Sequence, residues 1–199
     1  MKKCLLSFVF FLFFSSSSFS EVKLTKLLDQ LNSPWSLTIV EEQTYLITEK
    51  SGNLVLFNKA NNTRKNIKHN LNILEDGQGG LLDVLYQQGY VYVSYWGDRG
   101  SGTSSTSAAR AKFNKSELNF TNIFQANPPI NSGYHFGSRL VIKGEHLYIS
   151  AGERGGDSIA QDSSKHPGSI IRIYLDGTIP KDNPKFKGKP NWLPEIYQI

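Results

Sequence analysis

The chain has 199 residues, a formal net charge of +5 and a single cysteine, Cys4. The modest positive charge is spread along the chain without a recognisable nucleic-acid-binding module, so no nucleic acid is expected as a partner. Because no cysteine follows Cys4, a zinc or thiolate site built on cysteine is excluded from the rest of the chain.

The first twenty residues have the pattern of a signal peptide. Two lysines follow the first methionine, residues 5–14 are apolar, and residues 18–20 fit a small-x-small cleavage site. The apolar run is about half the roughly 20 residues that span a bilayer, although an uncleaved anchor is the alternative. We predict a signal peptide over residues 1–20, a mature domain over 21–199, a periplasmic or secreted location, and no stable membrane insertion after cleavage.

The mature chain contains short β-type segments and no long amphipathic helix. These segments are rich in Val, Ile, Leu, Tyr and Phe and are bounded by Gly, Asn, Asp and Pro, as strands should be. In chain order the predicted strands cover residues 36–40, 44–48, 53–58, 81–86, 90–95, 109–113, 139–142, 146–151 and 170–175, and a further strand begins within 194–199. The low-complexity stretch 97–107 is predicted to be a flexible surface loop rather than a domain boundary.

A repeat underlies these strands. Tyr45, Tyr92 and Tyr148 each begin a similar pair of strands, at a period of roughly 50 residues that is typical of four-stranded propeller blades. The residues after the signal peptide suffice for about three blades, whereas closed propellers have about four to eight. We therefore predict an all-β fold, a β-propeller of which this chain forms about the first three blades and lacks the C-terminal half. A β-sandwich is the competing interpretation.

One histidine stands out among the side chains that could perform chemistry. His135 lies between Gly133 and Gly137 and directly precedes a predicted strand. Loops that enter the innermost strand of a propeller blade line the central channel, so this histidine can face a ligand. One repeat earlier, Asp76 and Gln78 have the same layout. The alternatives are that His135 is a loop histidine without a catalytic role and that the segment with Asp76 and Gln78 is a purely structural glycine turn.

Other patterns are weaker. A phosphate loop is disfavoured because residues 81–86 are predicted as strand, where such a loop needs a helix. Acidic and glycine residues at 152–157 suggest a calcium loop but lack the helix–loop–helix pattern. No nucleophile elbow or dinucleotide fingerprint is present, which disfavours a nicotinamide enzyme. We expect His69 to be exposed and inert, His146 to be structural, and His166 to lie in a loop above the third blade.

Several segments, taken in order, resemble the soluble pyrroloquinoline-quinone (PQQ)-dependent sugar dehydrogenases of the glucose/sorbosone dehydrogenase family. The aldose sugar dehydrogenase branch is the most similar. The matching segments are residues 31–37, 47–52, 76–84, 135–140, 152–155, 160–162, 168–173 and 176–184. The resemblance implies a six-bladed propeller with PQQ lying over its central channel.

The resemblance also implies residue roles. His135 would be the general base that takes the proton from the anomeric hydroxyl of the sugar while hydride passes to the quinone. Gln78 would help to hold the substrate, and His135 and Gln78 would both contact the cofactor. Tyr134, expected to bind substrate, replaces an acid found in some glucose-type members, which favours a broader aldose specificity.

The same resemblance sets what this chain is expected to lack. The remaining PQQ contacts and the calcium ligands would lie beyond Ile199, so no metal ligand is assigned within the chain and the chain alone is expected to be inactive. The implied partners are a sugar substrate and an external electron acceptor. The alternative function is a non-catalytic secreted propeller that binds sugars or cell-surface partners.

Overall fold

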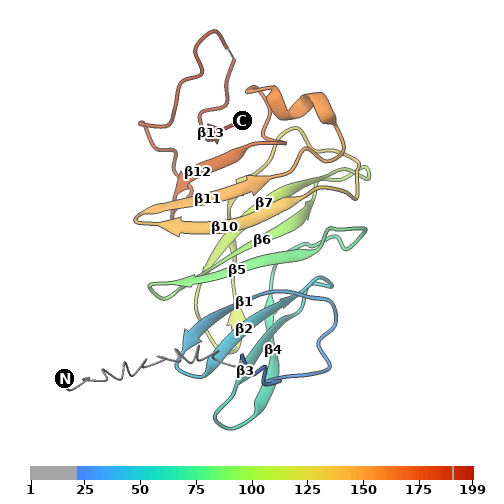
Figure 1. The fold of residues 1–199 in the computed structure, drawn as a ribbon, viewed down its shortest axis with the longest axis vertical. Coiled ribbons are helices and arrows are strands. Elements are labelled where there is room, and N and C mark those ends of the chain that lie inside the picture. Colours follow the sequence, from blue (N-terminus) through green and yellow to red (C-terminus); the bar gives the residue numbers. More distant parts are fainter. Residues whose placement is uncertain (1–21, 190) are drawn as a thin grey trace, which may run out of the picture.

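The computed structural model describes residues 22–189 and 191–199, so the predicted signal peptide lies outside the described residues. Three sheets follow one another along the chain and lie one above the other in Figure 1. The first contains β1 (Pro34–Glu41), β2 (Thr44–Glu49), β3 (Leu54–Asn58), β4 (Thr63–His69) and β8 (Glu117–Leu118). The second contains β5 (Leu81–Gln87), β6 (Tyr90–Asp98), β7 (Ser104–Lys112) and β9 (Thr121–Gln125). The third contains β10 (Gly137–Lys143), β11 (His146–Ala151), β12 (Ile170–Tyr174) and β13 (Ile196–Gln198).

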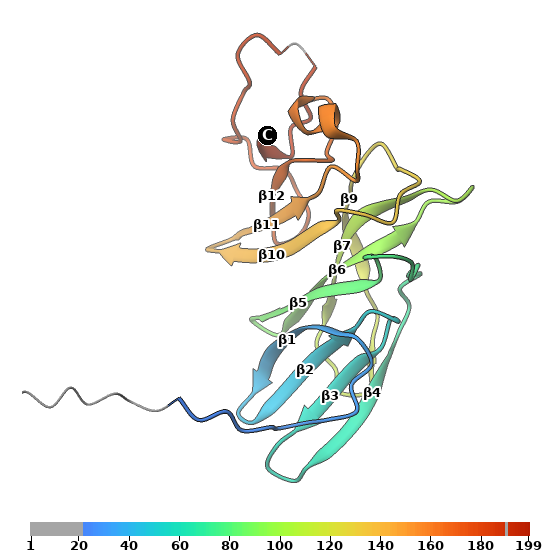
Figure 2. The ribbon, with the colours of Figure 1, turned by 45° about the vertical axis from the view of Figure 1, so that its right-hand side comes forward.

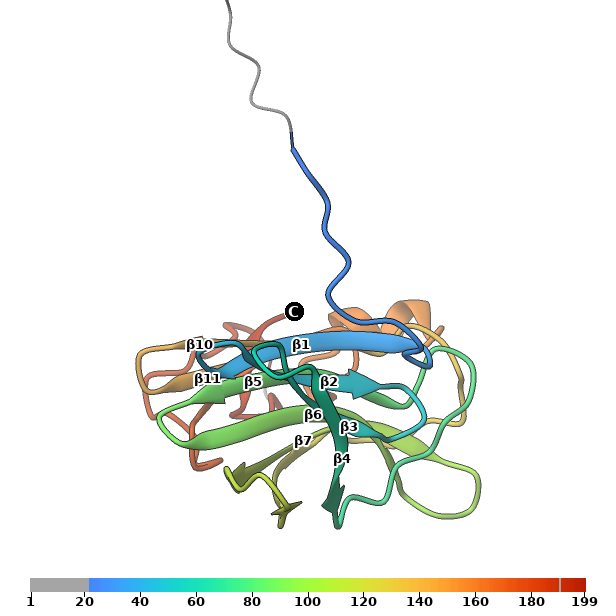
Figure 3. The ribbon, with the colours of Figure 1, turned by 90° about the horizontal axis from the view of Figure 1, so that it is seen from below.

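The repeat strands predicted at Tyr45, Tyr92 and Tyr148 are confirmed as β2, β6 and β11, and each pairs with the next strand in antiparallel fashion. The first strands of the three sheets, β1, β5 and β10, lie side by side, as the innermost strands of neighbouring blades do (Figure 2). The start of the described chain extends away from the sheets (Figure 3), whereas Leu28 and Leu31, nearer to β1, pack against the first sheet. A single 3-10 turn, Asp157–Gln161, is the only helical element among the described residues, and none of their helices could cross a membrane.

The hydrophobic cores lie between neighbouring sheets rather than inside one sheet. Between the first and second sheets, the buried side chains include Leu46, Leu54, Val84, Val91 and Val93. Between the second and third sheets they include Tyr92, Leu147, Ile149, Ile171 and Ile173. Because only the second sheet lies between two others, its strands β5 and β6 show nearly continuous buried runs, whereas β10 and β11 of the third sheet alternate between buried and more exposed residues.

The prediction of a flexible loop over residues 97–107 is wrong at both ends, since β6 extends to Asp98. Strand β7 begins at Ser104, and the side chains of residues 104–107 are buried. Their hydroxyl groups are bonded inside the protein: Thr106 Oγ1 donates to the carbonyl of Phe136 (3.1 Å) and Ser104 Oγ to that of Ile130 (3.3 Å). Because these serine and threonine hydroxyl groups form hydrogen bonds inside the protein, a segment with the composition of a linker can be a buried strand.

Three further strands, β4, β8 and β9, were missed; β8 has only two residues, and the other two have polar sequences. β4 exposes most of its side chains and β9 exposes three of five, so neither shows the expected hydrophobic alternation. Between β7 and β9 the chain crosses to the first sheet, where β8 pairs in parallel with β4, and then returns to the second sheet. This crossing ties the first two sheets together.

All three innermost strands are irregular close to their starts. The register shifts lie between Pro34 and Ser36 in β1, and in β5 and β10 at the corresponding places. Such bulges bend a strand and redirect its side chains. Beside them, Leu82, Trp96 and Phe136 form a buried apolar cluster against which Trp35 packs. This cluster supports the loops that precede β5 and β10.

Candidate active site

The loops that enter β5 and β10 meet directly, and they bring the two sequence-predicted residues Gln78 and His135 together. Gln78 Oε1 accepts a hydrogen bond from the backbone N–H of His135 (2.9 Å). The backbone N–H of Gln78 donates to the carbonyl of Gly133 (2.9 Å). Two loops more than fifty residues apart in the sequence are thereby joined at the base of His135.

A third loop, which follows β11, closes on the same point. Gly152 lies so near His135 that a Cβ at Gly152 would be 1.7 Å from the His135 carbonyl oxygen. Only glycine permits this approach. The next residue, Glu153, places its carboxylate oxygen Oε1 against Nδ1 of the His135 imidazole. Residues 152–157, which we weighed as a calcium loop, therefore supply a partner for the histidine.

The pairing with Glu153 determines which nitrogen of a neutral His135 imidazole carries the proton. The pKa of the Glu153 carboxyl is lowered, chiefly by the hydrogen bond from His135 and also by the backbone N–H of Gly155 (3.2 Å). A neutral imidazole that donates from Nδ1 to a carboxylate carries its free lone pair on Nε2. The His135 side chain is 55% exposed, so the ring is open to solvent. The arrangement suits a general base held in one tautomer.

The sequence interpretation did not give Glu153 or its neighbour Arg154 a role. Arg154 is buried and bonds to the carbonyls of Ser132 and Tyr134, on the N-terminal side of His135. The available signal was positional: the loop after a blade's second strand reaches the same end of the blade as the loop entering its first strand. An acidic residue immediately after β11 could have been paired with His135 on that ground.

An open pocket of about 380 Å³ adjoins these loops. Trp35, Lys50, Gln78 and Phe136 are among its lining residues. The Lys50 ammonium donates to the carbonyl of Gly77 (2.7 Å), and the guanidinium of Arg139 lies 3.9 Å from the centre of the Trp35 ring. The pocket thus combines flat aromatic faces with positive charge and a side-chain amide.

Tyr134, predicted to bind substrate, lies next to His135, and neither residue is part of the pocket lining. The Tyr134 side chain is 64% exposed, and its ring centre is 6.3 Å from that of His135 in an edge-to-face arrangement. It is therefore placed to meet a ligand that approaches His135 from solvent rather than one enclosed in the pocket.

The other three histidines have structural partners. His69, predicted to be exposed and inert, is instead half-buried, with Nε2 2.6 Å from the carbonyl of Gly52. His146 stacks on Tyr174 as a structural residue would. His166 is buried and accepts a hydrogen bond from the backbone N–H of Asn127 (2.9 Å). Among the described histidines, His135 is the one at the entrance of an innermost strand.

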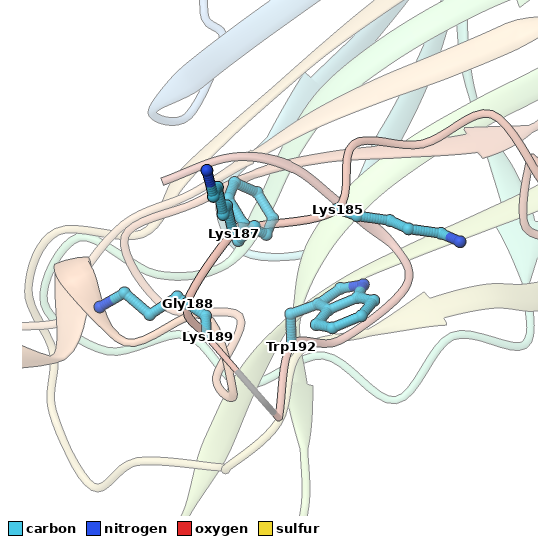
Figure 4. A pocket seen from close by; sticks show the side chains of 6 residues that line it. Lys185, Lys187, Gly188, Lys189 and Trp192 are labelled. Atoms are coloured by element: carbon cyan, nitrogen blue, oxygen red, sulfur yellow. The ribbon is translucent and has the colours of Figure 1, made fainter.

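A second hollow, of about 500 Å³, lies on the loop between β12 and β13 (Figure 4). Its lining residues are Lys185, Phe186, Lys187, Gly188, Lys189 and Trp192. Neither this lining nor that of the first pocket contains a histidine or a carboxylate. The first pocket, however, is lined by Gln78, which bonds to the backbone of His135, and by Phe136, the next residue in the chain. The hollow next to His135 is therefore the candidate active site.

Comparison with known proteins places this geometry in context. The family model described as glucose/sorbosone dehydrogenase matches residues 31–199. The Escherichia coli protein named aldose sugar dehydrogenase YliI is 32% identical over 176 residues, which cover 83% of this chain and 47% of that protein. The chain thus spans about half the length of the curated relatives that it matches.

Solved structures show the same likeness. The apo-form of the soluble aldose sugar dehydrogenase from Escherichia coli gives a TM-score of 0.78 at 31% identity, over 85% of this chain and 52% of that one. The PQQ-bound form of aldose sugar dehydrogenase from Streptomyces coelicolor gives 0.71 at 22% identity, over 84% and 52% respectively, which is a likeness of fold. The prediction of an all-β propeller, represented by about three blades, is confirmed.

Proposed function

The chain belongs to the glucose/sorbosone dehydrogenase family, and from this premise we propose that the complete protein oxidises aldose sugars at the anomeric hydroxyl with PQQ as the oxidant. The names of the Escherichia coli and Streptomyces relatives support the sugar class and the quinone. The observation that carries the proposal is the His135–Glu153 pair at the head of β10. A sugar-binding propeller without catalysis, the alternative, has no need for a base held in one tautomer.

The residues around the pocket fit one side of a planar, anionic quinone. Trp35 and Phe136 offer aromatic surface, while Lys50 and Arg139 offer positive charge for carboxylate groups. When bound, the quinone supplies the two-electron oxidant that accepts the hydride. Gln78 and His135 would contact it from the loops before β5 and β10.

Calcium is part of the same proposal, but the residues seen here do not form its site. Within residues 22–189 and 191–199, no group of three or more His, Cys, Asp or Glu side chains gathers where it could hold a metal ion. We propose that residues beyond Ile199 in the complete protein provide the calcium ligands and the remaining quinone contacts. On that basis the 199-residue chain by itself is expected to be inactive.

The chain's own residues would act as follows. His135 Nε2 would accept the proton of the anomeric hydroxyl as hydride leaves the carbon that bears this hydroxyl. The Glu153 carboxylate would then stabilise the positive charge of the imidazolium. The Oε1 atom of Gln78 accepts a hydrogen bond from the His135 backbone. The side-chain N–H groups of Gln78 would therefore donate to a ligand oxygen. Tyr134 would contact the sugar on its solvent side.

We further propose that the protein works outside the cytoplasm, after cleavage of the segment 1–20, and that an external acceptor takes the electrons from the reduced cofactor. These proposals rest on the sequence pattern of the first twenty residues and on the family.

The test uses the complete gene product, supplied with PQQ and calcium, and follows reduction of an artificial dye with a series of aldoses. His135→Asn should lower kcat by roughly 100- to 10,000-fold, the usual contribution of a general base. His146→Asn, which alters a histidine stacked on Tyr174, is the matched control and should keep most of the activity. Normal turnover in His135→Asn would overturn the assignment, and absence of dye reduction by the wild type would overturn the function.

A further inference from the structure

We propose that Arg154 is a positioning residue that holds the backbone leading into His135; this inference rests on the proposed function. The Arg154 side chain is 4% exposed and lies beneath the loop that carries the histidine. Its Nε donates to the carbonyl of Tyr134 (2.9 Å), and its Nη2 bonds to the carbonyl of Ser132. The guanidinium therefore binds two of the three carbonyl groups that immediately precede His135.

The guanidinium is anchored on its other sides as well. Nη2 also donates to Ser104 Oγ (3.3 Å) at the start of β7, in the neighbouring blade. The guanidinium carbon lies 3.7 Å from the centre of the Phe136 ring and 5.8 Å from that of Trp96. A second blade and an aromatic face thus fix the position of the guanidinium, so its hydrogen bonds can restrict motion of the loop before His135.

A buried arginine normally has a carboxylate partner, and this one has none within 4.0 Å among the described residues. Burial lowers the pKa of Arg154 to about 10, which leaves it charged at neutral pH. A buried charge without an opposite charge is costly unless its donors are satisfied. Here two backbone carbonyls and a hydroxyl accept hydrogen bonds from Nε and Nη2, which indicates that holding this loop is what the charge accomplishes.

The loop needs to be held because its backbone is strained. His135 has a φ of 48° and Arg154 has a φ of 62°, both in the left-handed region that side chains other than glycine rarely adopt. The turn at Arg154 lets two consecutive side chains reach the same histidine by different routes. Glu153 binds the imidazole, and Arg154 binds the backbone before it.

Substitution of Arg154 should therefore release the base without removing it. Arg154→Lys keeps the charge but has one ammonium group, which cannot match the planar set of donors, and Arg154→Met removes all donors at similar length. We expect amide hydrogen exchange of residues 132–137 to rise by about tenfold or more in both variants. The kcat of the complete protein should fall about tenfold or more while KM changes by less than about threefold, since the loop that carries Gln78 stays in place and the exposed Tyr134 is the one sugar-binding residue proposed in the loosened segment.

Arg172→Met is the matched control. Arg172 is also buried, but it lies on β12 and pairs with Asp182 (2.9 Å). This variant tests whether loss of any buried guanidinium loosens the whole fold. Exchange at residues 132–137 should stay at the wild-type level in Arg172→Met.

The complete protein is measured with and without PQQ and calcium. Selective loosening of 132–137 in Arg154→Lys, with the stated split between kcat and KM, supports the positioning role. Unchanged exchange there, or an equal rise in Arg172→Met, overturns it. If both Arg154 variants fail to fold, Ser104→Ala removes one anchor of the guanidinium; a rise in exchange at 132–137 then supports the role and no rise overturns it. Selective loosening together with a wild type that oxidises no sugar would leave the backbone contact standing and reject the proposed function.

Discussion

The carboxylate of Asp83, in the second blade, accepts a hydrogen bond of 2.8 Å from the backbone N–H of Leu140 in the third blade. Its other oxygen accepts a hydrogen bond of 2.6 Å from Ser36 Oγ in the first blade. Arg139 Nη1 lies 3.6 Å from this second oxygen. One buried carboxylate therefore joins the innermost strands of all three blades, directly below the loops that carry Gln78 and His135.

Asp83→Ala should destabilise the complete protein by about 2–4 kcal/mol, because it leaves the half-buried hydroxyl of Ser36 and the buried N–H of Leu140 without an acceptor. Urea unfolding followed by far-ultraviolet circular dichroism measures the change. Glu41→Ala is the control, since the Glu41–Lys115 pair is exposed and such pairs contribute about 0–1 kcal/mol. Similar losses in the two variants would contradict a special role for Asp83.

Gly79→Ala should disturb the turn that presents Gln78. A Cβ at Gly79 would lie 2.0 Å from Cε3 of the Trp96 ring, so the turn or the indole must move. We expect a loss of about 1–3 kcal/mol, as for other overpacked sites, and a change in tryptophan fluorescence. Gly133→Ala is the control in the same region, because its nearest contacts would be at 3.6 Å and should be tolerated. The interpretation is wrong if Gly79→Ala is as stable as Gly133→Ala.

The contribution of Glu153 to stability should depend on pH. The pKa of its carboxyl is lowered in the folded protein by the hydrogen bond from His135, so the charged form is favoured by folding. This stabilisation is complete above the ordinary carboxyl pKa of about 4.3 and is lost as the pH falls through the lowered value. The wild type should therefore exceed Glu153→Gln in unfolding free energy by more at pH 5 than at pH 3. Urea titrations at these pH values provide the comparison, and a difference that grows towards pH 3 would contradict the pairing.

Trp35→Ala should weaken PQQ binding to the complete protein by about two- to tenfold, the usual contribution of one aromatic contact. Loss of the indole also frees Arg139, which now lies over its ring. Titration with PQQ, followed by recovery of dye-reducing activity, gives the affinity. Trp192→Ala, in the hollow between β12 and β13, is the control and should bind PQQ as the wild type does. Equal affinity in the two variants would remove Trp35 from the proposed cofactor site.

Much of the fold could be predicted because its signals are local. The strand pairs that begin at Tyr45, Tyr92 and Tyr148 are apolar enough to be predicted as strands, and their recurrence indicates blades. Strand β4 and the strand residues 104–107 were not predicted, for opposite reasons. The first is a polar, exposed strand, and the second is a polar run that satisfies its hydroxyl groups internally and is buried.

By itself the sequence determined the β class, the repeat and the family resemblance, and it singled out His135, with Gln78 one repeat earlier, as candidate site residues. Only the tertiary structure decided which side chains surround that histidine. Glu153 and Arg154 lie eighteen and nineteen residues further along the chain and reach it because the loop after β11 folds back over the entrance to β10. No local pattern encodes such a contact, since it depends on the approach that Gly152 permits and on the left-handed backbone at His135 and Arg154.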